Sequence, residues 1–469
     1  MNILFGTDGW RGLLDSEMNF ENVSIVAQAF SDYINKRFEN PKVVVGYDGR
    51  KYSKEFAQLF AEICSGNKIE SILSDDIIPT PVISFTVKNK RLNAGVMITA
   101  SHNPAEYNGI KFKAYYGGPF LTEETIEVEK LLGNSKIIKD KSLVKIENLL
   151  SDYIKQLKKF VDLKVIKKSN LRILVDSMSG AGQMIIENIL KDANIEADTI
   201  FGTPCENFSG RYAEPIEKNL SPLKESLQKD GNYSFGIATD GDADRVGILL
   251  DDGNWLSAQE TILLLTDFLI NTKNLSGHLV KTSSVTDKLK KYFENEYRKV
   301  FNVQVGFKYI CEKMISENVV FGCEESGGYG YNGHIPERDG ILSGLIFVEM
   351  LAKSGKKKLS EYVEEKRKQF GNINYDRIDA EYLKDDRIDL LPKLFTKRPN
   401  KIGNYDIIEV EKYLSSRGII NGLKFVLEGD TRWLLIRASE TEPIVRFYAE
   451  GQSKEEVKKI LNQGMEFLK

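Results

Sequence analysis

An apolar, β-branched run that ends in a polar loop recurs along the chain, and this recurrence most constrains the fold. The runs cover residues 42–48, 94–99, 171–176 and 234–239. Helical patterns follow them, as at residues 54–65, and this alternation is typical of α/β units on a mostly parallel sheet. Functional residues of such sheets lie in loops at the carboxyl ends of strands. The residues in that position are Asp48, Ser101, Asp176 and Asp240. We therefore predict two or three related α/β domains in series.

The chain is too long for a single core. At 469 residues it corresponds to three or four domains of about 100–150 residues each. Residues 133–169 are charged with a helical pattern, and we expect them to link the first two domains. Strand-like runs at 434–437 and 444–448 precede a closing helix from Lys454. This last part is predicted to be an α+β domain.

The charge balance argues against strongly electrostatic partners. Lys and Arg total 65 against 68 Asp and Glu, so we expect no nucleic-acid binding and no attachment to an anionic membrane. The longest apolar stretches, at 261–265 and 341–351, are too short and too interrupted to span a bilayer. No signal peptide is expected, because the Gly-rich stretch at 5–9 follows Met1 almost at once. The four widely separated cysteines form no CxxC pair, which predicts buried free thiols and a cytoplasmic protein.

Three aspartates alternate in the loop that follows residues 234–239. Asp240, Asp242 and Asp244 stand at i, i+2 and i+4, from where their carboxylates can turn inward together. Such carboxylates repel one another unless a cation neutralises them, and hard oxygen ligands suit Mg²⁺. A solvated acidic turn is the alternative, and an EF-hand is a poorer fit because Arg245 replaces its glycine and Asp251 its glutamate. Arg245 could hold a phosphate or pair with an aspartate.

Ser101 lies in the loop Thr99-Ala100-Ser101-His102-Asn103-Pro104, directly after a buried strand. This place suits a nucleophile, although a hydroxyl needs a base or a metal to activate it. His102 is the nearest candidate base, but neighbours on an extended loop point to opposite sides. We therefore assign His102 a phosphate or substrate contact rather than a proton relay. Taken alone, such a Ser-His loop is an ordinary turn in most proteins.

Two positively charged side chains are candidates for the same site. Lys111 follows the pair Asn108-Gly109, which signals a tight turn, and starts a strand that we expect to return past Ser101. It could act as a general acid or base or as a charge clamp, although most lone lysines lie on the surface. Arg11 belongs to the Gly-rich stretch 5–12, where backbone N–H groups can cradle an anion.

Two later loops carry groups suited to a sugar and to a phosphate. The loop at 322–328 places Glu324 and Ser326 on a glycine-flanked turn, and His334 follows it. His278, outside such loops, is expected to be structural. Near the end of the chain, two guanidiniums and two hydroxyls could bind a phosphate without a metal. They belong to Arg437, Ser439, Thr441 and Arg446.

Taken in order, these loops resemble the motifs of the α-D-phosphohexomutase family, which includes phosphoglucomutases, phosphomannomutases and phosphoglucosamine mutases. The motifs are Thr-Ala-Ser-His-Asn-Pro, Asp-Gly-Asp-Ala-Asp-Arg, Glu-Glu-Ser-Gly-Gly and Arg-Ala-Ser-Glu-Thr-Glu-Pro. The resemblance extends from Gly6 to Arg446. It implies an α/β fold of four domains around a central cleft, with three related mixed-sheet α/β domains and a smaller C-terminal α+β domain. The implied boundaries are 1–140, 141–253, 254–372 and 373–469.

The resemblance also implies a role for each loop. Ser101 would carry a phosphoserine, whose phosphate would supply an oxygen to one Mg²⁺ bound by Asp240, Asp242 and Asp244. The transfer site would be lined by Arg11, Lys111, Arg245 and His102. Sugar recognition would fall to Glu324, Glu325, Ser326, His334 and Lys308. The phosphate that is not transferred would be held by Arg437, Ser439, Thr441 and Arg446.

The implied activity is the interconversion of hexose 1-phosphate and hexose 6-phosphate, with small-molecule hexose phosphates as partners of a monomer or weak homodimer. The phosphoserine would donate its group to the hexose phosphate, forming a 1,6-bisphosphate (glucose 1,6-bisphosphate for glucose) that turns end for end. Closure of the last domain would keep water out. The Glu-Glu-Ser loop resembles that of glucose-preferring members, with mannose as the alternative. Glu440 replaces the family's usual glycine, and we expect its side chain to point away from phosphate.

Two alternatives to this activity stay open from the sequence. In the first, Asp240 is the nucleophile and Asp242 the acid of a haloacid-dehalogenase-type phosphatase, although Asp244 stands where a small hydroxylated residue is expected. The second is a non-catalytic phosphosugar-binding regulator that has kept the loops.

Overall fold

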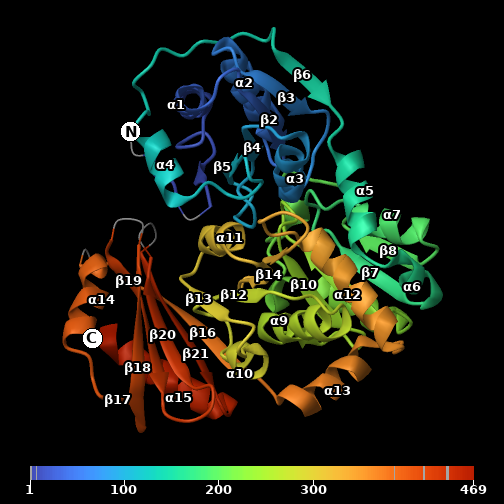
Figure 1. Ribbon diagram of the computed structural model, residues 1–469, viewed down its shortest axis with the longest axis vertical. Coiled ribbons are helices and arrows are strands. Elements are labelled where there is room, and N and C mark those ends of the chain that lie inside the picture. Colours follow the sequence, from blue (N-terminus) through green and yellow to red (C-terminus); the bar gives the residue numbers. More distant parts are fainter. Residues whose placement is uncertain (1–2, 7, 385, 416–417, 440–442, 469) are drawn as a thin grey trace.

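The structure is a computed structural model that describes residues 3–6, 8–384, 386–415, 418–439 and 443–468. Within these residues the chain forms four successive β-sheets, each accompanied by helices (Figure 1). The first three sheets contain both parallel and antiparallel pairs, whereas every pair in the fourth is antiparallel. The predicted class, three mixed-sheet α/β domains and a C-terminal α+β domain, is confirmed.

The first sheet has the strand order β1-β5-β4-β2-β3-β6. Its strands are β1 (Trp10–Leu13), β2 (Lys42–Tyr47), β3 (Glu70–Ser74), β4 (Ala94–Ile98), β5 (Tyr107–Ala114) and β6 (Val144–Glu147). Its helices are α1 (Phe20–Arg37), α2 (Ser53–Gly66), α3 (Thr80–Lys90) and α4 (Thr122–Glu129). The strands expected at 42–48 and 94–99 and the helix at 54–65 are confirmed. β6 pairs with β3, so residues 133–169 are not helical throughout and the first sheet continues past residue 140.

The pair Asn108-Gly109 lies inside β5, so the tight turn expected there is wrong. β5 begins at Tyr107, and Gly109 pairs with Arg11 of β1. A Cβ at Gly109 would lie 2.5 Å from the carbonyl oxygen of Trp10 and 2.8 Å from that of Thr99. Glycine is needed here because neighbouring backbones approach closely, and not because the chain reverses.

The second sheet has the order β11-β10-β9-β7-β8 and the third the order β13-β12-β14-β15. The strands of the second are β7 (Arg172–Asp176), β8 (Glu196–Ile200), β9 (Phe235–Thr239), β10 (Val246–Leu250) and β11 (Trp255–Leu256), and its helices are α5 (Leu150–Phe160), α6 (Leu163–Lys168), α7 (Ile185–Asp192) and α8 (Ser221–Asp230). The third has strands β12 (His278–Thr282), β13 (Val300–Val303), β14 (Val319–Cys323) and β15 (Tyr329–Tyr331). Its helices are α9 (Ala258–Asp267), α10 (Lys288–Phe293), α11 (Phe307–Ser316), α12 (Gly340–Ser354) and α13 (Leu359–Phe370).

The first two sheets share a local device at the end of a parallel strand. Asp48 follows β2 and its carboxylate accepts a hydrogen bond from the backbone N–H of Arg50 at 3.0 Å. Asp176 ends β7 and accepts the same bond from Met178 at 2.8 Å. Each aspartate also pairs with an arginine, Arg50 or Arg211. This repetition supports the prediction of related domains in series.

The fourth sheet has the order β16-β21-β20-β19-β18-β17 and is drawn from orange to red in Figure 1. Its strands are β16 (Asn374–Glu381), β17 (Lys401–Ile402), β18 (Tyr405–Leu414), β19 (Ile420–Leu427), β20 (Trp433–Ala438) and β21 (Ile444–Gly451). Its helices are α14 (Arg387–Thr396) and α15 (Lys454–Met465). The predicted strands and the helix from Lys454 are confirmed. Ser453 caps α15 by accepting a hydrogen bond from the N–H of Glu456, which explains the start of the helix.

A buried polar cluster joins the third and fourth domains. The carboxylate of Glu450, on β21, accepts hydrogen bonds from the hydroxyl of Thr286 at 2.7 Å and from the indole of Trp433 at 2.8 Å. Asp287 lies beside it and binds the ammonium of Lys424 at 2.9 Å. Burial, aided by the charge of Asp287, raises the pKa of Glu450 to about 7, although the two donors and Lys424 oppose the shift.

This raised pKa predicts that the domain junction weakens as pH rises. Between about pH 4.5 and 7 the folded protein keeps a proton on Glu450 that the unfolded chain has released. The free energy of unfolding should therefore fall by about 3 kcal/mol across this window. In Glu450→Gln the amide can donate to Thr286 while its oxygen accepts from Trp433. We expect the variant to have the higher Tm at pH 8 and a nearly equal Tm at pH 5; a difference of the same size at both pH values contradicts the account.

Two further expectations concern the surface and the cysteines. No helix in the described ranges is long and apolar enough to cross a membrane. Cys64, Cys311 and Cys323 are buried free thiols as predicted, whereas Cys205 is exposed, contrary to the prediction. Cys205 lies in the loop that follows β8, where its thiol donates a hydrogen bond to Asn207 Oδ1 at 3.1 Å.

Candidate active site

Ser101 follows β4 and is fully buried. Its φ of 56° is in the left-handed region, a conformation that costs a non-glycine residue about 1–3 kcal/mol. The N–H of Ser101 donates to Thr99 Oγ1 at 2.8 Å, and its Oγ donates to Asp240 Oδ2 at 3.0 Å. A Cβ at Gly241 would lie 2.5 Å from the carbonyl oxygen of Ser101. The serine loop of the first domain therefore touches the aspartate loop of the second.

The three aspartates of the second loop converge. Ligand atoms of Asp240, Asp242 and Asp244 lie within 4.8 Å of one another, and all three side chains are buried. Lys111, on β5, places its Nζ 2.8 Å from Asp242 and 2.9 Å from both Asp244 and Asp8. One ammonium thus contacts three carboxylates, those of Asp8, Asp242 and Asp244.

Burial and charge act on these groups in opposite directions. Burial raises the pKa of Asp240, and the charges of Asp242 and Asp244 raise it further. Burial also disfavours the charged form of Asp242, but Lys111 outweighs it and holds the pKa of Asp242 below its ordinary value. The pKa of Lys111 is raised because its three carboxylate neighbours outweigh the effect of burial, so the ammonium stays charged.

The aspartate cluster fits a divalent cation. Asp242 Oδ1 and Asp244 Oδ1 are buried and have no hydrogen-bond partner among the described residues. Buried carboxylate oxygens without partners are rare and costly, and a cluster of three carboxylates suits Mg²⁺ with its few protein ligands. Ser101 Oγ lies beside this cluster, 3.0 Å from Asp240 Oδ2.

Three other predicted residues surround Ser101. Arg11 donates from Nη1 to Asn103 Oδ1 of the serine loop at 2.7 Å. Arg245 places its Nε 3.8 Å from Asp240 Oδ2, without a hydrogen bond from that atom to any described residue. His102 Nδ1 lies 3.5 Å from Ser101 Oγ, too far for a strong hydrogen bond. Burial, together with the nearby arginines and Lys111, holds the pKa of His102 well below its ordinary value, so its imidazole is neutral.

Two residues without a predicted role, Asp8 and Arg338, complete this cluster. Arg338, in the loop before α12, donates from Nη2 to Asp8 and, at 2.8 Å, to Asp244. Its Nη1 lies 3.4 Å from Glu324 Oε2. One guanidinium of the third domain thus contacts a carboxylate from each of the first three domains. The only signal for these two residues in the sequence is their place in Gly-containing loops that carry other candidates.

The loop that is predicted to recognise the sugar follows β14. Glu324 and Glu325 are largely buried, and burial raises the pKa of both carboxyls. Glu324 faces Arg338, whereas Glu325 lies 3.9 Å from Nη1 of Arg377 on β16 and so connects this loop to the fourth domain. The Oγ of Ser326 is buried without a hydrogen bond to any described residue.

His334 and Lys308 stand apart from that turn. The Nε2 of His334 lies 2.8 Å from Asp339 Oδ2, and its ring packs against Phe85 of α3. Asp339 also caps α12 by accepting a hydrogen bond from the N–H of Leu342. His334 is therefore held by contacts with both the first and the third domain. Lys308 lies in the first turn of α11 and is largely buried.

Two arginines of the fourth domain lie opposite each other on neighbouring strands. Arg437 on β20 and Arg446 on β21 are direct cross-strand partners, an arrangement that repels unless an anion lies near. The Nε of Arg446 is 3.6 Å from Asp379 Oδ2 of β16. Ser439 follows β20, and its carbonyl oxygen accepts a hydrogen bond from Arg387 at 2.8 Å. Thr441 and Glu440 lie outside the described residues.

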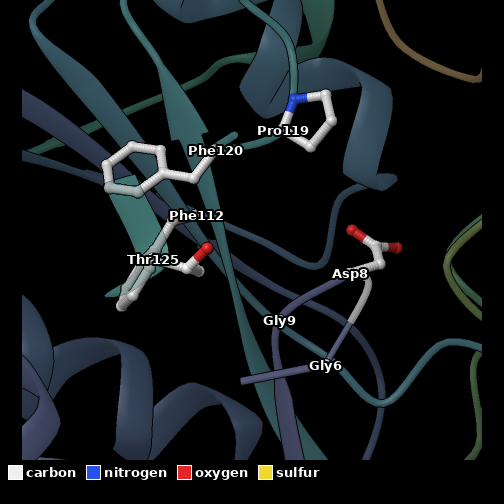
Figure 2. Close-up of a pocket in the computed structure, with 7 residues that line it drawn as sticks. All are labelled: Gly6, Asp8, Gly9, Phe112, Pro119, Phe120 and Thr125. Atoms are coloured by element: carbon white, nitrogen blue, oxygen red, sulfur yellow. The ribbon is translucent and has the colours of Figure 1, made fainter. Parts of the chain in front are cut away.

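A small cavity lies beside the N-terminal loop. Figure 2 shows Asp8 with Gly6 and Gly9 on one loop near the rings of Phe112 and Phe120. Its volume is about 10 Å³, enough for roughly one water molecule. It is too small to hold a sugar phosphate.

Comparison with known families matches the chain along most of its length. Models of the phosphoglucomutase/phosphomannomutase family match in chain order: α/β/α domain I at residues 2–137, domain II at 151–253, domain III at 257–370 and the C-terminal domain at 384–466. The chain belongs to the phosphoglucomutase/phosphomannomutase family. It is therefore a phosphohexomutase, an intramolecular phosphotransferase, and the phosphatase alternative is wrong.

Individual relatives of the mutase differ in the sugar that their names give. A phosphoglucomutase/phosphomannomutase of Thermococcus kodakarensis is 30% identical, with 100% of this chain and 99% of that protein aligned. A phosphoglucosamine/phosphogalactosamine mutase of Sulfurisphaera tokodaii is also 30% identical, over 99% and 98% of the two chains. A crystal structure from Thermus thermophilus, described as a phosphomannomutase, superposes with a TM-score of 0.87 at 32% identity and covers 100% and 99% of the two chains. An N-acetylphosphoglucosamine mutase of Aspergillus fumigatus, solved with GlcNAc-6P and magnesium, shares the fold at 16% identity, a TM-score of 0.60 and 100% and 96% coverage.

Proposed function

We propose that this phosphohexomutase interconverts hexose 1-phosphate and hexose 6-phosphate through a phosphoserine at Ser101 and a hexose 1,6-bisphosphate. The observation that carries the proposal is the position of Ser101 Oγ, 3.0 Å from a carboxylate of the aspartate cluster. A nucleophilic hydroxyl beside a buried cation site is the arrangement that phosphoryl transfer requires. The direct test is whether Ser101 becomes phosphorylated and whether that phosphoryl group then moves to the substrate.

The residues of the site have complementary tasks in this proposal. The bond between phosphorus and Ser101 Oγ breaks as a bond from phosphorus to a sugar hydroxyl oxygen forms, and in the net step the proton of that hydroxyl ends on Ser101 Oγ. The reverse step uses the other end of the bisphosphate. The ammonium of Lys111 contacts Asp242 and Asp244, from where it would stabilise negative charge in the transfer site. Arg11 and Arg245 flank the serine loop and would hold phosphoryl oxygens.

A magnesium ion fits the cluster of Asp240, Asp242 and Asp244, and the oxygens of Asp242 and Asp244 that lack hydrogen-bond partners among the described residues support its presence. When bound, it would neutralise charge on the phosphoryl oxygens during transfer. The magnesium in the Aspergillus mutase is consistent with this choice. Phosphate that is not transferred would be held by Arg437, Arg446, Ser439 and Thr441, and by resemblance this site must accept either end of the intermediate.

We also propose glucose as the preferred sugar, because the recognition loop reads Glu324-Glu325-Ser326. Glucose 1-phosphate should have a clearly higher kcat/KM than mannose 1-phosphate or glucosamine 1-phosphate. Steady-state rates with all three sugars, each primed with its own 1,6-bisphosphate, test this preference. Equal values for glucose and mannose, or a preference for glucosamine, would overturn the glucose proposal while leaving the mutase assignment intact.

We propose that the enzyme works in the cytoplasm, because its four cysteines are free thiols. We also propose a monomer or weak homodimer acting on free hexose phosphates, because one chain supplies every group named above. A cofactor role for glucose 1,6-bisphosphate follows as well, because it would restore phosphate to Ser101 whenever the intermediate escapes.

A further inference from the structure

A buried arginine holds the serine loop from behind. Arg50 lies in the loop after β2, and its side chain is fully buried. Its two Nη atoms donate to four backbone carbonyl oxygens of the loop that carries the nucleophile. The acceptors are Ser101 at 2.7 Å, Asn103 at 2.6 Å, Pro104 at 2.7 Å and Tyr107 at 2.9 Å.

The guanidinium itself is fixed from two other directions. Its Nε lies 3.2 Å from Asp48 Oδ2, and Asp48 Oδ1 accepts hydrogen bonds from the N–H of Arg50 and from Ser53 Oγ. The ring of Phe208, from the second domain, lies 4.6 Å from Arg50 Cζ. Because Phe208 also lines the space beside Gly241, Arg50 connects the serine loop to the neighbourhood of the aspartate loop.

These contacts act on the nucleophile through the backbone. The bond to the Ser101 carbonyl fixes the peptide plane after the serine, while Ser101 Oγ faces Asp240 on the other side. The left-handed φ of Ser101 is costly, and only surrounding structure that over-determines it can keep it populated. Four hydrogen bonds to a charged, planar donor supply that restraint. A lysine could not reproduce them, because its single ammonium has no fork geometry.

We propose that Arg50 is a positioning residue for phosphoryl transfer, which sets the orientation of Ser101 without touching the substrate. The proposal rests on the proposed function, in which Ser101 carries the phosphate. It predicts that Arg50 affects the transfer step and not sugar binding, because the sugar and distal-phosphate loops belong to other domains. A residue that merely stabilised the fold would instead lower the Tm without a selective effect on kcat.

The test is Arg50→Lys, which keeps the charge that faces Asp48 but loses the fork. We expect kcat to fall about 100-fold with KM for glucose 1-phosphate nearly unchanged, since a misplaced reacting group costs about that factor. Single-turnover transfer from phosphorylated enzyme to glucose 1-phosphate, followed by quench and mass spectrometry, should slow by the same factor. An unchanged transfer rate would overturn the proposal.

A matched control comes from the second domain. Arg211 pairs with Asp176 at 2.8 Å and donates to the carbonyl of Asn219 at 2.9 Å, but it holds no loop of the active site. Arg211→Lys should lose a comparable amount of stability and keep the wild-type kcat. An equal loss of kcat in both variants would reduce Arg50 to a structural role and overturn the proposal.

A second variant and a phosphorylation measurement test the proposal even if Arg50→Lys does not fold. Where Arg50→Lys does not fold, Asp48→Asn loosens the guanidinium while leaving its donors in place, and it should lower kcat by a smaller factor; an unchanged kcat counts against the proposal. Treating wild-type protein with glucose 1,6-bisphosphate distinguishes a failure of the proposed function from a failure of the positioning role alone. Absence of phosphate on Ser101 refutes the proposed function, whereas phosphate on Ser101 with a normal transfer rate in Arg50→Lys refutes only the positioning role.

Discussion

Replacing Ser101 by alanine should abolish mutase activity, with kcat falling by at least about 10⁴-fold, because the carrier of the phosphoryl group is lost. Two other hydroxyls of the site are already engaged, because Thr99 Oγ1 accepts a hydrogen bond from the Ser101 N–H and Thr80 Oγ1 donates to Asp242 Oδ2 at 2.5 Å. The measurement is a coupled assay in which glucose 1-phosphate is converted in the presence of Mg²⁺ and a trace of glucose 1,6-bisphosphate.

The control for this variant is Ser142→Ala, which removes an exposed hydroxyl and should keep wild-type kcat. Circular dichroism of Ser101→Ala should match wild type, because alanine removes only one buried hydroxyl. Activity within tenfold of wild type in Ser101→Ala would contradict the assignment of the nucleophile.

Replacing Asp240 by asparagine is expected to lower kcat by about 10³-fold at saturating Mg²⁺, because this carboxylate serves both the cation and Ser101. The Mg²⁺ concentration for half-maximal activity should also rise, which activity measured against Mg²⁺ after removal of metal with EDTA would show. In metal-free buffer the Tm should not fall, because burial and the neighbouring aspartates disfavour the charged form of Asp240 and raise its pKa, whereas asparagine is neutral and still offers Ser101 Oγ an acceptor.

Asp252→Asn is the matched control, since this exposed carboxylate lies just beyond β10 in the same domain. It should leave both kcat and the Mg²⁺ dependence unchanged. Wild-type enzyme should be inactive in EDTA and recover with Mg²⁺. Full activity of wild type in EDTA, or an unaltered Mg²⁺ dependence in Asp240→Asn, would contradict the metal site.

The sequence predicts the strands that position the site because their signal is local. Runs such as 94–99 and 234–239 are β-branched and apolar, and each ends where a polar loop begins, so the carboxyl ends of the strands identify Ser101 and Asp240. The convergence of Asp240, Asp242 and Asp244 follows from alternation within five residues. These parts of the fold and site need no knowledge of distant contacts.

The rest of the site depends on contacts between domains, which local patterns do not contain. Arg338 lies 94 residues from Asp244, and nothing near it in the sequence signals that pairing. Arg50 donates to backbone carbonyl oxygens. Every residue has such an oxygen, so no residue type in the sequence marks the partners of Arg50. The prediction of a tight turn at Asn108-Gly109 is wrong for the same reason. The glycine is needed because the backbones of Trp10 and Thr99 approach it closely, and the neighbouring sequence does not indicate that approach.

The central claim is that Ser101 carries the phosphoryl group, and the most direct test is to locate that group. Wild-type protein is incubated with glucose 1,6-bisphosphate, digested and mapped by mass spectrometry, before and after a chase with glucose 1-phosphate. The account predicts one phosphate per chain on the peptide that contains Ser101, and its transfer to the sugar during the chase. Phosphate on an aspartate, on another serine, or on Ser101 but unmoved by the chase would contradict it.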